Sequence, residues 1–307
     1  MKQVLLLVVS LAVAIGLGEY ACRRLIRERL AVATDERNLL YRYDSTLGWF
    51  PDPNTVREFT GERTIQVRHN SLGIRDVEVP PKAVGRPRIA FFGDSIVWGY
   101  DAEATERFSD VIRRHRPGWD IANCGVSGYG TDQALLLMER LIPVLHPDIV
   151  VLVFNKWDRN DNILSENHGG YAKPIFRIEN GELELANVPV PLNAKSRWSE
   201  SALYRQSFLW RLLVQTAAAP KIAVHEDPSE RIVDRMNDEA AASDARLVIV
   251  LAGPDEQMLA HAQEKEIPVV ETEQALLAAA TADVPTRYIG HGAHLTPAGH
   301  EVIASLL

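Results

Sequence analysis

The sequence has little cysteine and no excess of positive charge. Only two of its 307 residues are cysteines, Cys22 and Cys124, which excludes a disulfide framework and metal sites built from CxxC pairs. The formal net charge is -8, which argues against a nucleic-acid partner, because such a partner requires a basic face. Internal repeats and low-complexity tracts are also missing. Since 46% of the residues are apolar, the chain is able to bury a sizeable core.

Common phosphate-binding patterns are missing as well. The glycine-rich stretch 120–130 contains neither the GxGxxG of dinucleotide-binding folds nor the lysine of a P-loop, so nucleotide binding is not expected. Ser127 does not form GxSxG, because Tyr129 stands in place of the last glycine. Three histidines lie in the stretch 291–300, but no second cluster with ligand spacing accompanies them, which disfavours a metal site.

An apolar run from Val4 to Gly18 opens the chain. Its length lies between that of a signal-peptide core and that of a full membrane span, so residues 1–22 are predicted to be a signal peptide or a signal anchor. Tyr20 and the arginines that follow it resemble an interfacial flank, which favours an uncleaved anchor. By the positive-inside rule alone, those arginines would keep the C-terminal side in the cytoplasm, which conflicts with export. A buried core helix is the third alternative.

Short apolar runs alternate with amphipathic segments from residue 88 onward. Such alternation is typical of an α/β fold, in which helices cover both faces of a parallel sheet. Strands are predicted at 89–92, 120–124, 148–154 and 246–252. Helices are predicted at about 106–115, at 131–142 with Pro143 kinking or ending the helix, and after Thr296-Pro297.

Two other segments break this alternation. Residues 23–87 are predicted to be a linker and a small pre-domain, so that the main domain covers 88–307. Between Asn155 and about residue 202 the pattern stops again, which predicts an insertion with a small hairpin that turns at Asn180-Gly181. An insertion after the carboxyl end of a strand is where open α/β folds place substrate-binding loops.

A serine and a histidine, far apart in the chain, are the candidate catalytic residues. Ser95 ends the tripeptide Gly93-Asp94-Ser95, which directly follows a predicted buried strand. Because a serine hydroxyl is a weak nucleophile, it needs an adjacent base, and His294, just before the last predicted helix, is the candidate. The glycine-rich turn that includes Gly128 is able to supply backbone N–H groups to an oxyanion. A plain strand-to-helix connection and a phosphate-binding loop are the other interpretations of that turn.

Together these stretches resemble the SGNH/GDSL hydrolase superfamily. Residues 92–95 resemble its first block, 123–128 its second and 294–300 its last. The resemblance implies a flavodoxin-like three-layer α/β/α fold, Ser95 as nucleophile, His294 as base, Gly128 as an oxyanion donor, and no cofactor. Residues 47–49 and 70–76 resemble the lead-in of bacterial membrane-anchored members. That implies a location at the bacterial inner membrane facing the periplasm, or secretion if the N-terminus is cleaved.

The third block departs from the family pattern. The family has an oxyanion asparagine just after the third strand, with an aspartate behind it. An ungapped match places Trp157 at the asparagine position, with Asp158 in step behind it. Asn155 or Asn160 substitutes for it only if the loop is re-registered. Losing one oxyanion donor typically costs about 10²–10³ in rate.

The last block departs too. The family has an aspartate three residues before the catalytic histidine, and here that position is His291. A carboxylate orients the imidazole and stabilises its charged form, which His291 cannot do. A backbone carbonyl or a remote acid such as Asp283 is the alternative for orienting His294. We therefore predict a serine–histidine dyad with incomplete or rebuilt surroundings.

The predicted activity is hydrolysis of acyl esters, specifically acetyl esters, with cell-surface carbohydrate as the substrate by fold-level analogy. A non-catalytic binding or assembly factor for a surface polymer, and an acyltransferase using the same dyad, are the alternatives. Four aromatic residues in or near the insertion are candidates for stacking on sugar rings, with ordinary packing as the other interpretation. They are Trp157, Tyr171, Phe176 and Trp198.

Overall fold

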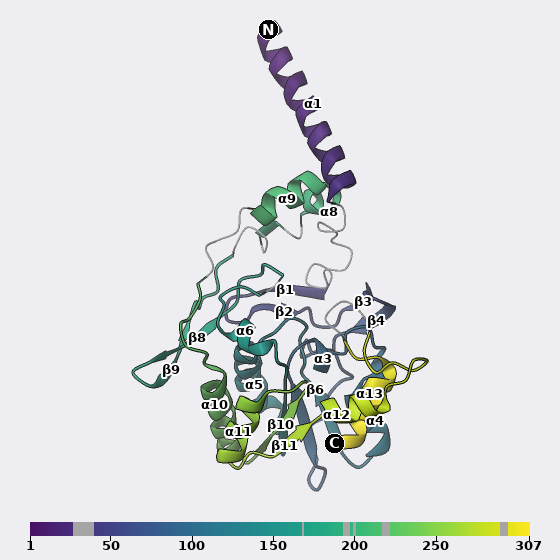
Figure 1. Ribbon diagram of the computed structural model, residues 1–307, viewed down its shortest axis with the longest axis vertical. Coiled ribbons are helices and arrows are strands. Elements are labelled where there is room, and N and C mark those ends of the chain that lie inside the picture. The colour runs from purple at the N-terminus through teal and green to yellow at the C-terminus, as the bar shows by residue number, and fades with distance from the viewer. Residues whose placement is uncertain (27–39, 168, 193–196, 199–200, 217–221, 289–293) are drawn as a thin grey trace.

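The computed structural model describes residues 1–26, 40–167, 169–192, 197–198, 201–216, 222–288 and 294–307. One long helix, α1 (Lys2–Leu25), extends from a mixed α/β body (Figure 1). None of the apolar window of α1 is buried, so the alternative of a core helix is wrong. Within the described residues α1 is the one helix long and apolar enough to cross a membrane.

A parallel sheet of five strands forms the centre of the body. Its strand order is β11-β10-β7-β5-β6, and every neighbouring pair is parallel, which confirms the predicted flavodoxin-like fold. The fifth strand, β11, was not predicted, because it is short and only half-buried at its two valines. The strands are β5 (Arg88–Phe92), β6 (Asp120–Asn123), β7 (Ile149–Phe154), β10 (Arg246–Leu251) and β11 (Val269–Glu271).

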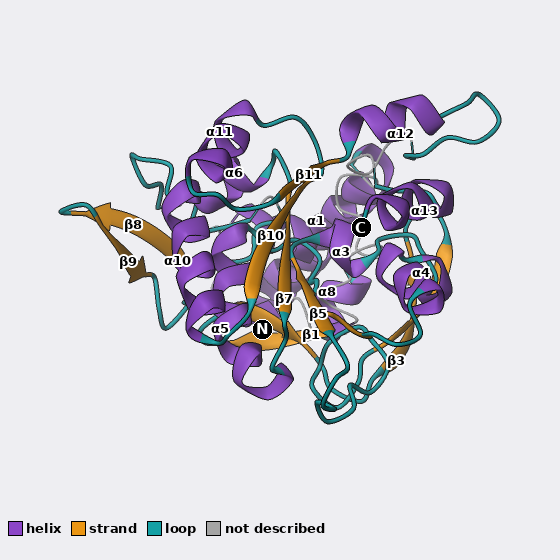
Figure 2. Cartoon of the chain, turned by 90° about the horizontal axis from the view of Figure 1, so that it is seen from below, coloured by secondary structure: helices purple, strands orange, loops and turns teal. Residues whose placement is uncertain are grey.

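Helices cover both faces of this sheet (Figure 2). Alternate residues of one strand enter opposite cores: Phe91 packs against Phe108 of α4, with ring centroids 5.1 Å apart, whereas Phe92 belongs to the other core. A strand buried on both faces needs apolar residues throughout, as the sequence predicts. One face carries α5 (Thr131–Leu145), α10 (Ser229–Ala242) and α11 (Glu256–Glu264). The other carries α4 (Phe108–His115), α12 (Glu273–Ala279) and α13 (Pro297–Leu306).

Helix α5 shows that Pro143 does not end the helix, one of its two predicted effects. The helix continues through this proline to Leu145 and ends at His146, which has a φ of +46°. A proline in the last turn removes one backbone hydrogen bond, while buried Ile142 and Leu145 keep the turn packed on the core.

Residues 40–87 form two antiparallel hairpins that pack on the body. Trp49, Phe59 and Val67 from these hairpins are buried in the same core as Phe92. The division of the chain into domains stays a prediction, but these residues share a core with the sheet. The strands are β1 (Tyr41–Asp44), β2 (Gly48–Pro51), β3 (Val56–Thr60) and β4 (Thr64–Arg68).

The predicted insertion contains a hairpin and the short helix α6 (Asp158–Asn162). Strands β8 (Ile175–Glu179) and β9 (Glu182–Ala186) pair through Asn180 and Gly181, whose φ angles are +53° and +83°. Positive φ at both central residues is the reason for the Asn-Gly preference in such turns. Two further helices, α8 (Ala202–Gln206) and α9 (Phe208–Thr216), follow the insertion.

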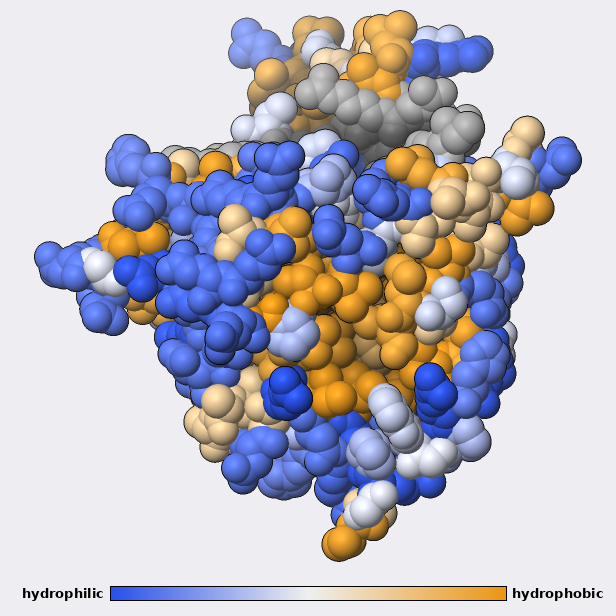
Figure 3. Space-filling view, turned by 60° about the horizontal axis from the view of Figure 1, so that its bottom comes forward, coloured by the Kyte–Doolittle hydropathy of each residue, from blue (hydrophilic) through white to orange (hydrophobic). Residues whose placement is uncertain are grey.

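The end of the molecule opposite α1 is shown in Figure 3. Apolar residues occupy the centre of this surface, and hydrophilic residues surround them. The α/β body lies between α1 and this end of the molecule. The apolar surface in Figure 3 is therefore separate from the apolar surface of α1.

Candidate active site

Ser95 lies at the carboxyl end of a central strand. β5 ends at Phe92, the chain turns at Gly93, and Ser95 begins the short helix α3 (Ser95–Trp98). Gly93 has a φ of +149°, and a Cβ there would lie 2.8 Å from the Val153 carbonyl oxygen, so the turn requires glycine. The chain goes from β5 to β6 on one side, whereas β7 lies on the other, so Ser95 is at the switch point where such folds bind ligands.

His294 lies beside this serine. Its Nε2 is 2.8 Å from Ser95 Oγ, within hydrogen-bond distance, and both residues are half-buried. The Tyr288 N–H donates to the carbonyl of His294, at 2.9 Å. The ring of Tyr100 stacks on the imidazole, with centroids 4.1 Å apart and planes 14° from parallel. The arrangement allows Nε2 to accept the hydroxyl proton of Ser95.

The second block packs tightly against the helix that carries Ser95. Asn123, at the end of β6, donates its amide to the Val97 carbonyl at 2.7 Å. A Cβ on Gly125 would lie 2.4 Å from the backbone nitrogen of Trp98, so only glycine fits there. Gly128 follows in a turn with a φ of +79°. Its part as an oxyanion donor stays a prediction.

The two candidate asparagines of the third block have different surroundings. Asn155 directly follows β7 and is buried, and its amide donates at 3.1 Å to Oδ2 of Asp94, the residue before Ser95. Asn160 is exposed on α6, and Trp157 is 54% exposed. An amide nitrogen carries two N–H groups, so the bond to Asp94 leaves one for a substrate oxygen. The loop therefore brings Asn155, rather than Trp157, next to the serine turn.

Two buried carboxyl groups hold this asparagine. Asp94 caps α3 by accepting from the Ile96 N–H at 2.8 Å, and its burial raises its pKa to about 6. Asp158 accepts from the Asn155 N–H at 3.2 Å and from the Thr131 hydroxyl at 2.9 Å. Burial, and then the charge of Asp94, raise the pKa of Asp158 well above its usual value. The backbone and the side chain of Asn155 are thus each bonded to one of these carboxyl groups.

The sequence offered a backbone carbonyl or a remote acid such as Asp283 to orient the His294 imidazole. Asp283 is exposed, and its part in orienting His294 stays a prediction. His291 lies outside the described residues. Tyr100 was missed in the sequence, because no pattern distinguishes it from an ordinary core aromatic.

The four aromatic residues predicted as candidates for sugar stacking differ in how much of each side chain is exposed. Tyr171 and Phe176 are only 5% and 0% exposed, so they are core residues and cannot present a ring to a ligand. Tyr171 instead packs against Trp49, with ring centroids 6.0 Å apart. Trp157 and Trp198 are exposed, at 54% and 43%.

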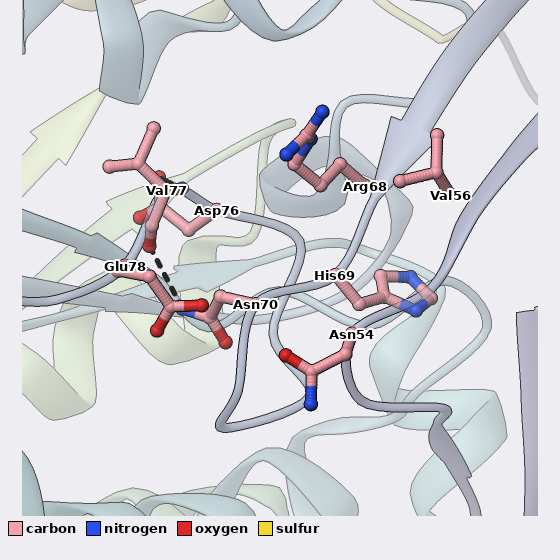
Figure 4. A pocket seen from close by; sticks show the side chains of 8 residues that line it. All are labelled: Asn54, Val56, Arg68, His69, Asn70, Asp76, Val77 and Glu78. Carbon is pink, nitrogen blue, oxygen red and sulfur yellow. Dashed lines mark hydrogen bonds between the residues drawn. The ribbon is translucent and has the colours of Figure 1, made fainter.

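A cavity of about 480 Å³ lies elsewhere, between the β3–β4 hairpin and the segment that follows it (Figure 4). None of the predicted catalytic residues lines it. Asp76 in its wall is already bonded to Arg113, at 2.7 Å, and to the Asn123 N–H, at 2.7 Å. These contacts make Asp76 a structural residue. Among the described residues no group of three or more His, Cys, Asp or Glu is arranged to hold a metal ion.

Comparison with known proteins gives similarities of structure only. No protein-family model matches the chain, and no curated protein matches it significantly. Solved structures similar to it include the lipase/acylhydrolase from Enterococcus faecalis, at 16% identity and a TM-score of 0.42, covering 72% of this chain and 92% of that one. A member of the lipolytic protein G-D-S-L family from Veillonella parvula is similar at 15% identity and a TM-score of 0.41, covering 71% and 94%. The acetyl xylan esterase AlAXEase is similar at 13% identity and a TM-score of 0.41, covering 71% and 96%. At such values the likeness assigns no activity to this chain, so an assignment depends on the residues of the site itself.

Proposed function

We propose that this chain is a serine esterase of the SGNH/GDSL type that hydrolyses acyl esters, specifically acetyl esters, with Ser95 as nucleophile and His294 as base. The observation that supports this most directly is the 2.8 Å separation of His294 Nε2 and Ser95 Oγ at the switch point of the sheet. A serine hydroxyl that donates to an imidazole is the arrangement that activates the oxygen.

The reaction follows from the positions of these atoms. Ser95 Oγ attacks the ester carbonyl carbon while His294 Nε2 takes the hydroxyl proton. The carbonyl oxygen gains the negative charge, which the Asn155 amide and the Gly128 N–H would stabilise. The carbon–oxygen bond to the alcohol then breaks, and His294 returns the proton to the departing alcohol. Water, deprotonated by His294, attacks the acyl carbon of the Ser95 ester. The bond from that carbon to Ser95 Oγ then breaks, His294 returns the proton to Oγ, and the acid is released.

The setting proposed for this reaction is the outside of the inner membrane, on acetylated cell-surface carbohydrate. The exposed helix α1 supports attachment to a membrane. Trp157 lies two residues after Asn155, at the start of the insertion, and is 54% exposed. Its ring is therefore able to stack on a sugar ring.

A fluorophosphonate probe tests the proposal. We expect covalent labelling of the wild type, no labelling of Ser95→Ala, and full labelling of Ser127→Ala, which removes the rival serine. A wild type that takes no label and does not hydrolyse p-nitrophenyl acetate would favour the non-catalytic binding factor. Acyl transfer to a sugar in preference to water would favour the acyltransferase.

A further inference from the structure

Helices α8 and α9 lie at the base of α1 and contact its C-terminal end (Figure 1). The Glu19 carboxylate of α1 accepts hydrogen bonds from the Phe208 N–H, at 3.0 Å, and from the Leu209 N–H, at 2.9 Å. These N–H groups open α9 and have no partner within their own helix, so Glu19 caps it. The Arg23 guanidinium donates to the Gln206 carbonyl at 2.7 Å. The end of α1 is therefore bonded to the turn between α8 and α9.

Packing accompanies these hydrogen bonds. A Cβ on Gly18 would lie 3.2 Å from Leu209 Cδ2, so glycine lets α9 approach α1 closely. The Arg23 guanidinium lies 4.9 Å from the centroid of the Phe208 ring. Removal of residues 1–22 as a signal peptide would leave the first N–H groups of α9 without Glu19. The contacts thus indicate that α1 is part of the mature fold.

The same two helices expose apolar side chains. Leu203 and Leu213 are 53% and 50% exposed, and Trp198, at 43%, packs edge-on against Trp210 with ring centroids 5.6 Å apart. Beside them, Tyr20 of α1 is 62% exposed. Arg23 and Arg24 occupy the last turn of α1. Tryptophan, tyrosine and arginine at the end of an apolar helix are typical of the membrane–water interface.

We propose that α8, α9 and Trp198 form an interfacial collar, which lies in the headgroup region of the bilayer that α1 enters, and that α1 stays attached. Helices α8 and α9 adjoin the base of α1, so one bilayer is able to contact both (Figure 1). The apolar stretch 4–18 covers about 22 Å at about 1.5 Å per residue, less than the ~30 Å hydrocarbon core. Apolar side chains at the base of α1 compensate for that short span.

Quenching of tryptophan fluorescence tests the collar. The full chain is reconstituted in phosphatidylcholine vesicles whose acyl chains carry bromine close to the headgroup. We expect quenching in the wild type, loss of more than half of it in the double variant Trp198→Phe/Trp210→Phe, and none of that loss in Trp157→Phe. Trp157 is a matched control because it is as exposed as Trp198 but lies in the body.

A second pair of changes keeps the test valid if the tryptophan variant does not fold. Leu203→Ser/Leu213→Ser alters two exposed side chains and should also reduce the quenching by at least half. Unchanged quenching in both double variants, or equal loss in Trp157→Phe, overturns the collar. A dimer in detergent whose collar residues cross-link to a second copy, with no quenching in vesicles, overturns it too.

A separate measurement tests whether α1 remains attached in the mature protein. We expect the intact mass of the protein purified from membranes to include residues 1–22. A mass that corresponds to a chain beginning after Glu19 overturns this part, because the cap of α9 would then be missing. Failure of either test leaves the esterase proposal unaffected, since that depends on labelling of Ser95.

Discussion

The serine side and the histidine side of the candidate site are held in different ways. Ser95 follows directly from a central strand, and a required glycine turn and the packed second block fix its backbone. His294, 199 positions further along the chain, reaches the same point through a bridge between Arg287 and Leu295 and through stacking on Tyr100. The position of Ser95 is thus fixed by the end of a sheet strand, whereas that of His294 depends on tertiary contacts of a separate segment.

The largest expected effect comes from removing the base. His294→Ala should lower kcat for p-nitrophenyl acetate by about 10³-fold or more, because the serine hydroxyl loses its proton acceptor. His261→Ala is the matched control, because His261 lies on α11 and its imidazole is bonded to Asp234 of α10 rather than to Ser95. The kcat of this variant should stay within about twofold of the wild type. Equal rates for the two variants would contradict the dyad.

The next effect distinguishes the two asparagines on the serine side. Asn155→Ala should lower kcat by about 10²–10³-fold with little change in KM, because an oxyanion donor acts in the transition state. Asn160→Ala, exposed on α6, should leave kcat within about twofold. Steady-state kinetics on both variants measure this, and the reverse order of effects would refute the re-registered loop.

Crowding of the second block tests how rigid the serine side is. Gly125→Ala places a Cβ 2.4 Å from the backbone nitrogen of Trp98, so the strand end must shift. The free energy of unfolding should fall by about 2 kcal/mol in urea. Gly118→Ala, where a Cβ meets nothing within 4 Å, should change it by less than about 0.5 kcal/mol. Similar values for both would show that the packing at Gly125 adapts.

The histidine side is tested at Tyr100. Tyr100→Leu removes the stacked ring, and kcat should fall about 3- to 10-fold, the equivalent of roughly 1 kcal/mol for an aromatic pair. Tyr100→Phe keeps the ring and should retain kcat within about twofold. If both variants lose the same activity, the hydroxyl rather than the stacking is important.

The last prediction concerns how the free energy of unfolding changes with pH. The pKa of buried Asp94 is raised to about 6, above the ~3.9 of an unfolded aspartate. The folded state therefore binds the proton more tightly, and the stability this gives is present below about pH 4 and is lost as the pH rises through about 6. Asp94→Asn lacks this titration, so urea unfolding at several pH values should show wild type losing stability relative to the variant. A constant difference would argue against the raised pKa.

Much of the serine side was predictable from local pattern. The buried strand before Gly93, the sharp turn and the place of Ser95 follow from apolar runs and turn chemistry over a few residues. That His294 comes just before a helix was also predictable, because Thr296-Pro297 is a typical helix start. In the structure Thr296 caps this helix by accepting from the Gly299 N–H. The distance of His294 from Ser95 was not predictable, because it depends on how two remote segments pack.

Local pattern determined the alternation of strands and helices, the parallel sheet, and the glycine turns around Ser95, because periodicity and φ requirements act within a few residues. Only the tertiary structure brought Asn155 to Asp94 while it left Asn160 and Asp283 exposed. It also stacked Tyr100 on His294 and buried Tyr171 and Phe176. A shift of register in one loop changes which side chain meets a neighbouring strand, and the amino-acid pattern of that loop is the same for either register.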